Sequence, residues 1–276
     1  MHLSVVLALL LLGVSPAQSR SLKGVNQTHH EEGSGDTADS SEEDFSVSSI
    51  IERANKKIGQ APGDPKLMFG DIVMHTGFQN AHPCIFSGCM WPKYSDGRVY
   101  VPYAIANHYS YPEIATIERA LQSFARSTCI QFVPRSREPD FIYIQSLTGC
   151  YSRVGRTGGM QTLSLARHGC IYHHVIQHEL LHALGFVHEH SRSDRDNYVR
   201  IHLENVIPGQ EHNFDKIQTN NLNTPYDYNS VIQYGGLFFS SNQRPTIIPI
   251  PDSSVPIGQA TQMSHYDIQR VNNLYC

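Results

Sequence analysis

The sequence predicts an α+β fold from the order of its elements and from one extended metal-binding motif. An amphipathic helix separates segments of β-rich composition, and further helices follow them; the expected strands begin near residues 99, 130, 141 and 162. Strands, helix, strands and helix in this order are typical of α+β domains. A chain of 276 residues, 40% of them hydrophobic and 17% charged, is long enough to bury a substantial core.

The first residues are typical of a secretory signal peptide. An apolar run over residues 3–14 is followed by small residues around Ala17 and Ser19, although no Lys or Arg precedes the run. The run is too short to span a bilayer, which favours a cleaved signal peptide over residues 1–19. No later stretch has the length and apolarity of a membrane anchor. We therefore expect a secreted, extracellular protein without membrane attachment, and leave storage in secretory granules open.

Residues 20–79 are expected to form an acidic, partly disordered propeptide. Seven acids and no Lys or Arg lie within residues 31–44. Residues 20–79 hold ten acids and six bases, a net charge of 6 − 10 = −4, whereas residues 80–276 hold fifteen of each. The absence of a basic excess argues against nucleic-acid binding. Any N-linked glycan is expected at Asn26, in the sequon Asn-Gln-Thr.

Several further elements follow from local patterns. Residues 47–58 have the spacing of a short helix, and a strand that begins at Val99 is expected to end at Pro102. Ser110 and Glu113 form a capping box before an amphipathic helix that should end near Cys129. The glycine-rich residues 155–159 lack the Lys of a phosphate loop, which indicates a turn or bulge.

The strongest signal is H-E-x-x-H-x-x-G-x-x-H over residues 178–188. On a helix within residues 171–184, His178 and His182 lie on one face. Gly185 permits the change of direction that brings back His188 as a third nitrogen ligand. Three neutral imidazoles suit one Zn²⁺ ion and leave a position open for water, the arrangement of a catalytic site. Short H-E-x-x-H strings arise by chance, but each added residue has a separate geometric task, which favours the metal site.

Other histidines receive ordinary interpretations. His173 and His174 lack enough neighbouring ligands for a second zinc site, so we expect exposure or hydrogen bonding to the first site. His190 is expected to be a loop residue. The six cysteines suggest three disulfides, and the absence of CxxC argues against a cysteine zinc site; spacing alone leaves fifteen pairings open.

Asp71, in the segment Leu-Met-Phe-Gly-Asp-Ile, is a candidate for a blocking group. Alone, a glycine followed by an acidic residue is more often a surface turn. Upstream of a catalytic zinc site, however, a carboxylate can occupy the open position and displace the water. Asp71 is therefore expected to keep an enzyme latent.

Together these residues resemble the astacin family of secreted zinc metallopeptidases. The resemblance covers nearly all of residues 80–276 and includes the zinc motif HELLHALGFVHE, together with CIQFVPR, GCYSRVGRTGG and TPYDYNSVIQYG. It implies a two-lobed metzincin fold, with a five-stranded sheet and the zinc helix in the upper lobe. The lower lobe would be irregular and end in a helix over residues 264–275.

The resemblance also implies the pairings and the processing of the chain. The expected disulfides join Cys129 to Cys276, Cys150 to Cys170 and, as in the six-cysteine branch that includes the teleost hatching enzymes, Cys84 to Cys89. An activating protease would cut near Gln79 and Asn80, and the new N-terminus would approach Glu189. The zinc ligands would be His178, His182 and His188, with Glu179 as general base and Tyr234 as oxyanion donor.

One departure from the family pattern keeps an alternative open. The family has Ser-x-Met-His-Tyr beneath the zinc, whereas this chain has Ile232 and Gln233 before Tyr234. A non-catalytic binding protein with the same fold is therefore a competing hypothesis, and a structural zinc module is a weaker one because a fourth ligand is missing. The favoured hypothesis is a monomeric zinc endopeptidase that acts on proteins or peptides, with egg-envelope proteins as the substrates that the resemblance suggests.

Overall fold

A five-stranded sheet forms the framework of the protein. The computed structural model describes residues 45–73 and 88–276. The sheet has the order β4-β3-β5-β7-β6 and is parallel except at the β6–β7 edge. Its strands are β3 (Val99–Ile105), β4 (Ile130–Pro134), β5 (Phe141–Gln145), β6 (Cys150–Tyr151) and β7 (Met160–Leu165). Within the described ranges, no helix is long and apolar enough to cross a membrane.

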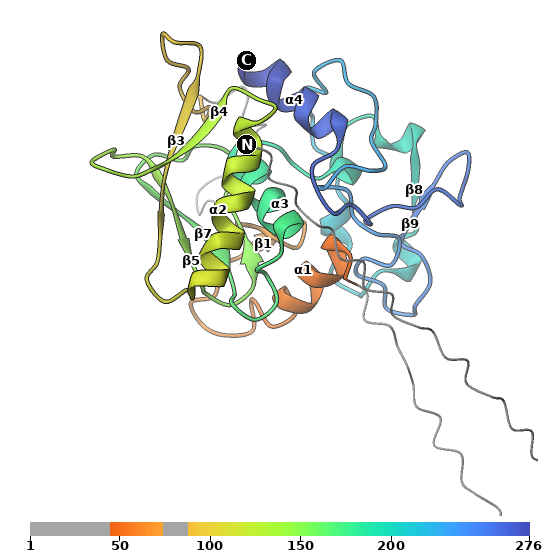
Figure 1. Ribbon diagram of the computed structural model, residues 1–276. Coiled ribbons are helices and arrows are strands. Elements are labelled where there is room, and N and C mark those ends of the chain that lie inside the picture. Colours follow the sequence, from red (N-terminus) through yellow and green to blue (C-terminus); the bar gives the residue numbers. More distant parts are fainter. Residues whose placement is uncertain (1–44, 74–87) are drawn as a thin grey trace, which may run out of the picture. The chain divides into compact units, whose positions relative to one another are not determined.

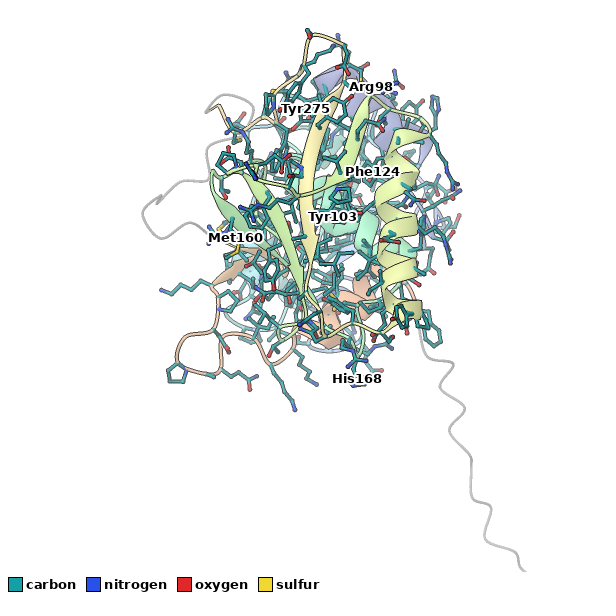
Figure 2. All side chains as sticks on the ribbon, turned by 60° about the vertical axis from the view of Figure 1, so that its left-hand side comes forward. Arg98, Tyr103, Phe124, Met160, His168 and Tyr275 are labelled. Carbon is teal, nitrogen blue, oxygen red and sulfur yellow. A yellow bond between two sulfur atoms is a disulfide. The ribbon has the colours of Figure 1, made fainter. Side chains whose placement is uncertain are left out.

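Helices α2 and α3 pack together within the main hydrophobic core beside this sheet. Helix α2 (Tyr111–Ala125) packs against β4 and against α3 (His173–Ala183). Phe124 of α2 is completely buried, with its ring centroid 5.3 Å from that of Phe132 on β4 (Figure 2). This packing holds α3, and therefore the zinc motif, in a fixed position relative to the sheet.

A second, smaller core lies in the C-terminal half of the chain. Strands β8 (Val199–Ile201) and β9 (Ile247–Pro249) pair antiparallel, and four 3-10 helices accompany them: Glu189–Ser191, Arg195–Asn197, Leu203–Asn205 and Glu211–Phe214. Val206, Phe214, Tyr234 and Phe238 belong to this core, which is separate from that of the sheet. The last helix, α4 (His265–Tyr275), closes the chain. These two larger cores agree with the expected α+β fold of two lobes.

The segment before the sheet is folded onto the protein (Figure 1). Helix α1 (Val47–Asn55) is capped by Ser46 and buries Val47, Ile50 and Ile51 in the main core. Strands β1 (Leu67–Met68) and β2 (Ile72–Val73) form a small hairpin, and Ile72 also bridges in parallel to Ser152, just beyond β6. Part of the expected propeptide therefore extends the main sheet.

Some expected boundaries were wrong. The strand that begins at Val99 does not end at Pro102 but continues to Ile105. Val99 and Tyr103 bond toward β4, so Pro102 faces the β5 side, where pairing begins only at Tyr103. The N–H that proline lacks would have had no partner there, and the strand loses no ladder bond. Helix α2 ends at Ala125 rather than near Cys129.

The cysteine pairing agrees with the resemblance where it is described. Cys129 pairs with Cys276, and Cys150 pairs with Cys170. Cys84 lies outside the described residues, so its pairing with Cys89 stays a prediction. The signal peptide, Asn26 and the expected cleavage point after Gln79 also lie outside the described residues.

Candidate metal centre

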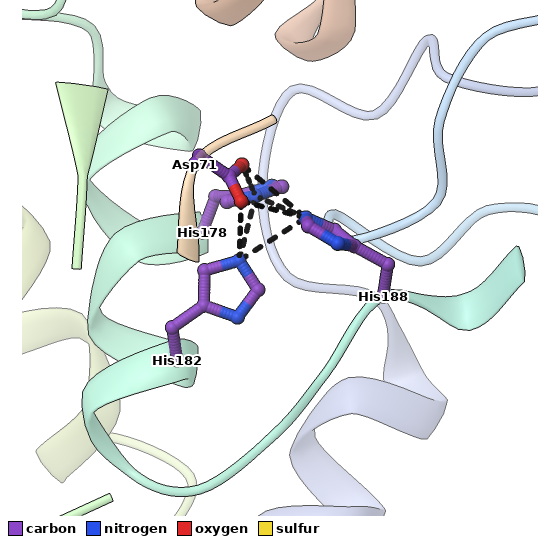
Figure 3. Close-up of side chains that lie close together, drawn as sticks. All are labelled: Asp71, His178, His182 and His188. Carbon is purple, nitrogen blue, oxygen red and sulfur yellow. Dashed lines mark hydrogen bonds and ion pairs between the residues drawn. The ribbon is translucent and has the colours of Figure 1, made fainter. Parts of the chain in front are cut away.

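Helix α3 and the turn after it bring three imidazoles together (Figure 3). His178 and His182 are one turn apart, and their Nε2 atoms are 3.0 Å from each other. Gly185 has φ 103° and ends the helix with a bond from its N–H to the carbonyl of His182, 2.8 Å. The chain then returns His188, whose Nε2 lies 3.2 Å from both other Nε2 atoms.

The hydrogen bonds of these rings show which nitrogens are available to a metal. Nδ1 of His178 donates to the carbonyl of Val231, 2.8 Å, and Nδ1 of His182 donates to that of Phe186, 2.7 Å. A carbonyl can only accept, so in the neutral rings the Nε2 atoms carry lone pairs. Burial lowers the pKa of His178 and lowers that of His188 further, which favours neutral rings.

The donor set fits zinc. Tetrahedral zinc with bonds of about 2.0 to 2.1 Å to nitrogen needs ligand atoms roughly 3.3 Å apart. The three Nε2 atoms are 3.0 to 3.2 Å apart. Lone pairs held this close to one another repel unless a cation lies between them. The cluster is therefore arranged for a metal ion and not for hydrogen bonding.

Asp71 supplies the fourth donor. Its Oδ2 is 2.9 Å from Nε2 of His178, and its Oδ1 is 3.2 Å from Nε2 of His188 and 3.5 Å from that of His182. Asp71 and the three histidines are buried, and their ligand atoms all lie within 4.8 Å of one another. Burial would raise the pKa of Asp71, but its position beside the histidines holds that pKa well below the usual value. Asp71 is thus an ionised group at the metal centre.

Glu179 lies beside this group without belonging to it. Its side chain is completely buried, and neither carboxylate oxygen has a hydrogen-bond partner within the described part of the chain. Burial, and secondarily the negative charge of Asp71, raises the pKa of Glu179 well above its usual value. An unpartnered buried carboxyl group is costly and indicates a chemical role rather than a structural one.

Tyr234 reaches the centre from the second core. Its hydroxyl lies 2.9 Å from Oδ2 of Asp71 and also contacts the carbonyl of Phe69. Its ring packs against Phe238, with centroids 3.6 Å apart, and against His188 at 4.1 Å. Burial raises the pKa of Tyr234 well above its usual value, so the hydroxyl stays protonated and can donate a hydrogen bond.

His190 is more than the loop residue that the sequence suggested. It is completely buried, stacks on Tyr234 with centroids 4.8 Å apart, and its Nε2 lies 3.1 Å from the carbonyl of Asn213. Burial lowers its pKa to about 4, so the ring is neutral. His173 and His174 are partly exposed and stand outside the metal group.

Glu189 is held by two arginines. Arg270 of α4 contacts both of its carboxylate oxygens at 2.7 Å, and Arg192 approaches Oε1 at 3.1 Å. The N–H of Asp227 donates to the same carboxylate, 2.7 Å. Burial nevertheless raises the pKa of Glu189 to about 7. Arg270 was not predicted from the sequence, although the capping box formed by Ser264 and Asp267 marks the helix that carries it.

The two residues that depart from the family pattern, Ile232 and Gln233, are buried and take part in hydrogen bonds. Ile232 is 2% exposed, and its carbonyl accepts the N–H of Glu189, 3.0 Å. Gln233 accepts from the hydroxyl of Tyr226, 2.6 Å, and donates to the carbonyl of Tyr234, 2.7 Å. Neither side chain belongs to the metal group.

Comparison with known proteins identifies the family of the chain. Residues 90–276 match the model of the astacin peptidase family. The chain belongs to the astacin family. It is 54% identical over 213 residues to high choriolytic enzyme 1 of Oryzias latipes, covering 77% of this chain and 78% of that protein. It is also 46% identical over 272 residues to the low choriolytic enzyme of the same fish, covering 98% and 96%.

A solved structure with high sequence identity has the same fold. High choriolytic enzyme 1, described as a hatching enzyme zinc-protease from medaka, superposes with a TM-score of 0.68 at 56% identity. The match covers 71% of this chain and 98% of that one. The chain is therefore a zinc metalloendopeptidase of the astacin family, and its cofactor is one Zn²⁺ ion.

Proposed function

We propose that this astacin-family chain is a secreted zymogen that Asp71 keeps latent. The observation that supports this is the Asp71 carboxylate among the three zinc-binding histidines, 2.9 Å from His178. A catalytic zinc site needs an open position for water, and an ionised carboxylate at that position excludes it. Asp71 belongs to the segment that we expect to be removed on activation.

The path of the same segment supports a steric block. The N–H of Ser152 donates to the carbonyl of Asp71, 3.0 Å, and the N–H of Val73 donates to the carbonyl of Ser152, 2.9 Å. The backbone around Ile72 thus occupies the outer edge of the sheet beside the metal centre. An extended substrate that would pair with this edge has to displace it.

After activation, the reaction would use three groups of this chain. Zinc, held by His178, His182 and His188, supplies Lewis-acid chemistry that polarises the scissile carbonyl and makes a water molecule acidic. Glu179 would take the proton of that water and deliver it to the leaving amine. Tyr234, released from Asp71, would donate its hydroxyl proton in a hydrogen bond to the developing oxyanion.

The chain would be processed in two steps. Residues 1–19 would act as the signal peptide, residues 20–79 as the propeptide and residues 80–276 as the mature peptidase. A separate protease would cut near Gln79 and Asn80. Glu189 is our candidate partner for the new N-terminal ammonium group, because it is a buried carboxylate near the zinc site. We propose a monomeric, extracellular enzyme.

Its substrates are proposed to be extracellular proteins of the egg envelope. The choriolytic enzymes named above, one of them described as a hatching enzyme, support this class. The competing hypothesis of an inactive binding protein rests on Ile232 and Gln233. The presence of both Glu179 and Tyr234 at the metal centre favours catalysis.

Latency can be tested with one substitution and a matched control. Asp71→Ala should make the uncut full-length chain active on a casein-type substrate, while the unaltered chain stays inactive until cleaved. Asp64→Ala removes a carboxylate of the same segment that, among the described residues, accepts the N–H groups of Gly59 and Ala61, and this variant should remain latent. If uncut Asp71→Ala is inert while its cleaved product is active, the backbone around Ile72, and not the carboxylate of Asp71, is the blocking group.

A further inference from the structure

The zinc-binding ring of His178 stands at the end of a chain of hydrogen bonds. Its Nδ1 donates to the carbonyl of Val231, 2.8 Å. The N–H of the same peptide group, that of Ile232, donates to Oγ of Ser230, 3.2 Å. The hydroxyl of Ser230 donates to Oδ1 of Asp267 on α4, 2.6 Å. Each hydrogen bond in this series is donated away from the metal centre and toward the carboxylate of Asp267.

The carboxylate of Asp267 is surrounded by hydrogen-bond donors. It is 1% exposed and receives the N–H of Val231 and the N–H of Ser264, both at 2.9 Å, besides the hydroxyl of Ser230. The guanidinium of Arg270 lies 3.8 Å from its Oδ1. Burial raises the pKa of Asp267, and the three donors and the cation oppose that rise and favour a negatively charged carboxylate.

This series of hydrogen bonds carries the effect of the negative charge to His178, because each bond polarises the next. A hydrogen bond that pulls on the peptide N–H of Ile232 makes the carbonyl of Val231 a stronger acceptor for the proton on Nδ1. The proton is thereby fixed on Nδ1, and Nε2 becomes a better electron donor toward the metal. His188 has no such support, since its Nδ1 lacks a hydrogen-bond partner among the residues described.

We propose that Asp267 and Ser230 are positioning residues that tune the zinc ligand His178. They act through the peptide group between Val231 and Ile232, which the departure from methionine at position 232 leaves intact. This role is independent of latency, because it concerns how tightly the ligand set holds zinc in the folded chain.

The test measures zinc affinity in the full-length protein. Ser230→Ala breaks the chain of bonds, and Asp267→Asn removes its charge at almost constant volume. By analogy with other groups that orient metal ligands, each should weaken zinc binding about 10-fold to 100-fold in competition with a chelator. Ser230→Thr keeps the hydroxyl and should restore affinity to within about threefold of the unaltered protein.

A matched control separates this role from general support of α4. Ser264→Ala removes the helix cap, whose hydroxyl accepts the N–H of Asp267 at 2.9 Å, but leaves the bonds to His178 in place. Its zinc affinity should be unchanged even if its melting temperature falls. The visible absorption of the Co²⁺-substituted protein gives a second readout and should shift for Ser230→Ala but not for Ser264→Ala.

The outcomes decide the proposal. Loss of affinity and a spectral shift in Ser230→Ala, with restoration in Ser230→Thr, support it even if Asp267→Asn fails to fold. Zinc affinity of Ser230→Ala within twofold of the unaltered protein would overturn it. So would an equal loss in Ser264→Ala, because helix stability alone would then explain the effect.

Discussion

Glu179 is the residue whose burial has no structural reason. Its carboxylate is fully buried and has no hydrogen-bond partner within the described residues, a cost that the proposed role as general base would offset. In the cleaved enzyme, Glu179→Gln should retain stoichiometric zinc and lower peptide hydrolysis by about 10²-fold to 10⁴-fold, the usual contribution of a general base. Metal analysis and turnover of a fluorogenic peptide check this. Unchanged turnover would exclude Glu179 as the base.

Ile232 stands where the family pattern has a methionine beneath the zinc. It is 2% exposed within the main core, and its backbone carbonyl, not its side chain, bonds to the N–H of Glu189. Ile232→Met preserves volume approximately and should change the free energy of unfolding by less than about 1.5 kcal/mol. Denaturant unfolding and zinc content test this. A gain of activity greater than tenfold would show that the native isoleucine impairs catalysis.

At the scale of elements, helix α1 would support the proposed latency through Asn55. The amide of this residue donates to the carbonyls of Gly70, 2.8 Å, and Cys150, 2.7 Å, and its Oδ1 accepts the N–H of Cys150, 2.8 Å. It thus joins the peptide group preceding Asp71 to the sheet edge. The fit is close, because a Cβ on Gly149 would lie 2.1 Å from Oδ1 of Asn55.

Asn55→Ala should therefore loosen the blocking carboxylate while leaving Asp71 in place. We expect measurable activity of the uncut chain, at least tenfold above the background of the unaltered chain. Gln60→Ala removes only an exposed side chain that bonds to the carbonyl of Lys56, and should have no effect. An Asn55→Ala chain that remains fully latent would show that α1 does not help to hold the block.

The start of helix α2 gives a prediction for pH. Glu113 accepts the N–H of Ser110 at 2.6 Å and lies 3.0 Å from Nε of Arg167. The bond with Arg167 and then those with Ser110 lower its pKa from 4.5 to about 2. Because the folded-state pKa is the lower one, this stabilisation is present above pH 4.5 and is lost as the pH falls toward 2. The stability difference from Glu113→Gln should shrink across that window in unfolding titrations.

The elements also show what the sequence could and could not predict. Helices α2 and α4 follow from apolar periodicity, and helix α3 follows from the zinc motif. The ligands His178 and His182 follow from helical spacing, and His188 follows from the turn at Gly185. Strands β6, β8 and β9 are two or three residues long, so their existence depends on distant partners such as Leu165 and Ile247. The contacts of Asn55 and Asp267 join residues far apart in the sequence, and no local pattern specifies them.

At the scale of the whole molecule, helix α4 connects segments that are far apart in the sequence. Its residues Asp267 and Arg270 hold the segments around Val231 and Glu189, and the hydroxyl of Tyr275 donates to the carbonyl of Leu184, 2.8 Å, at the end of α3. Cys276 fixes the end of the helix to Cys129, which directly precedes β4. Helix α4 thus links the end of the zinc helix, the segments beside the zinc ligands and the start of β4.

This arrangement predicts unequal roles for the two described disulfides. The bond from Cys129 to Cys276 spans 147 residues and that from Cys150 to Cys170 spans 20. Loop-closure entropy then predicts contributions of about 5 and about 3 kcal/mol. The double variant Cys129→Ser with Cys276→Ser should therefore unfold at lower denaturant than Cys150→Ser with Cys170→Ser. It should also bind zinc more weakly, because α4 would lose its anchor. Equal unfolding midpoints with unchanged zinc affinity would contradict this account of α4.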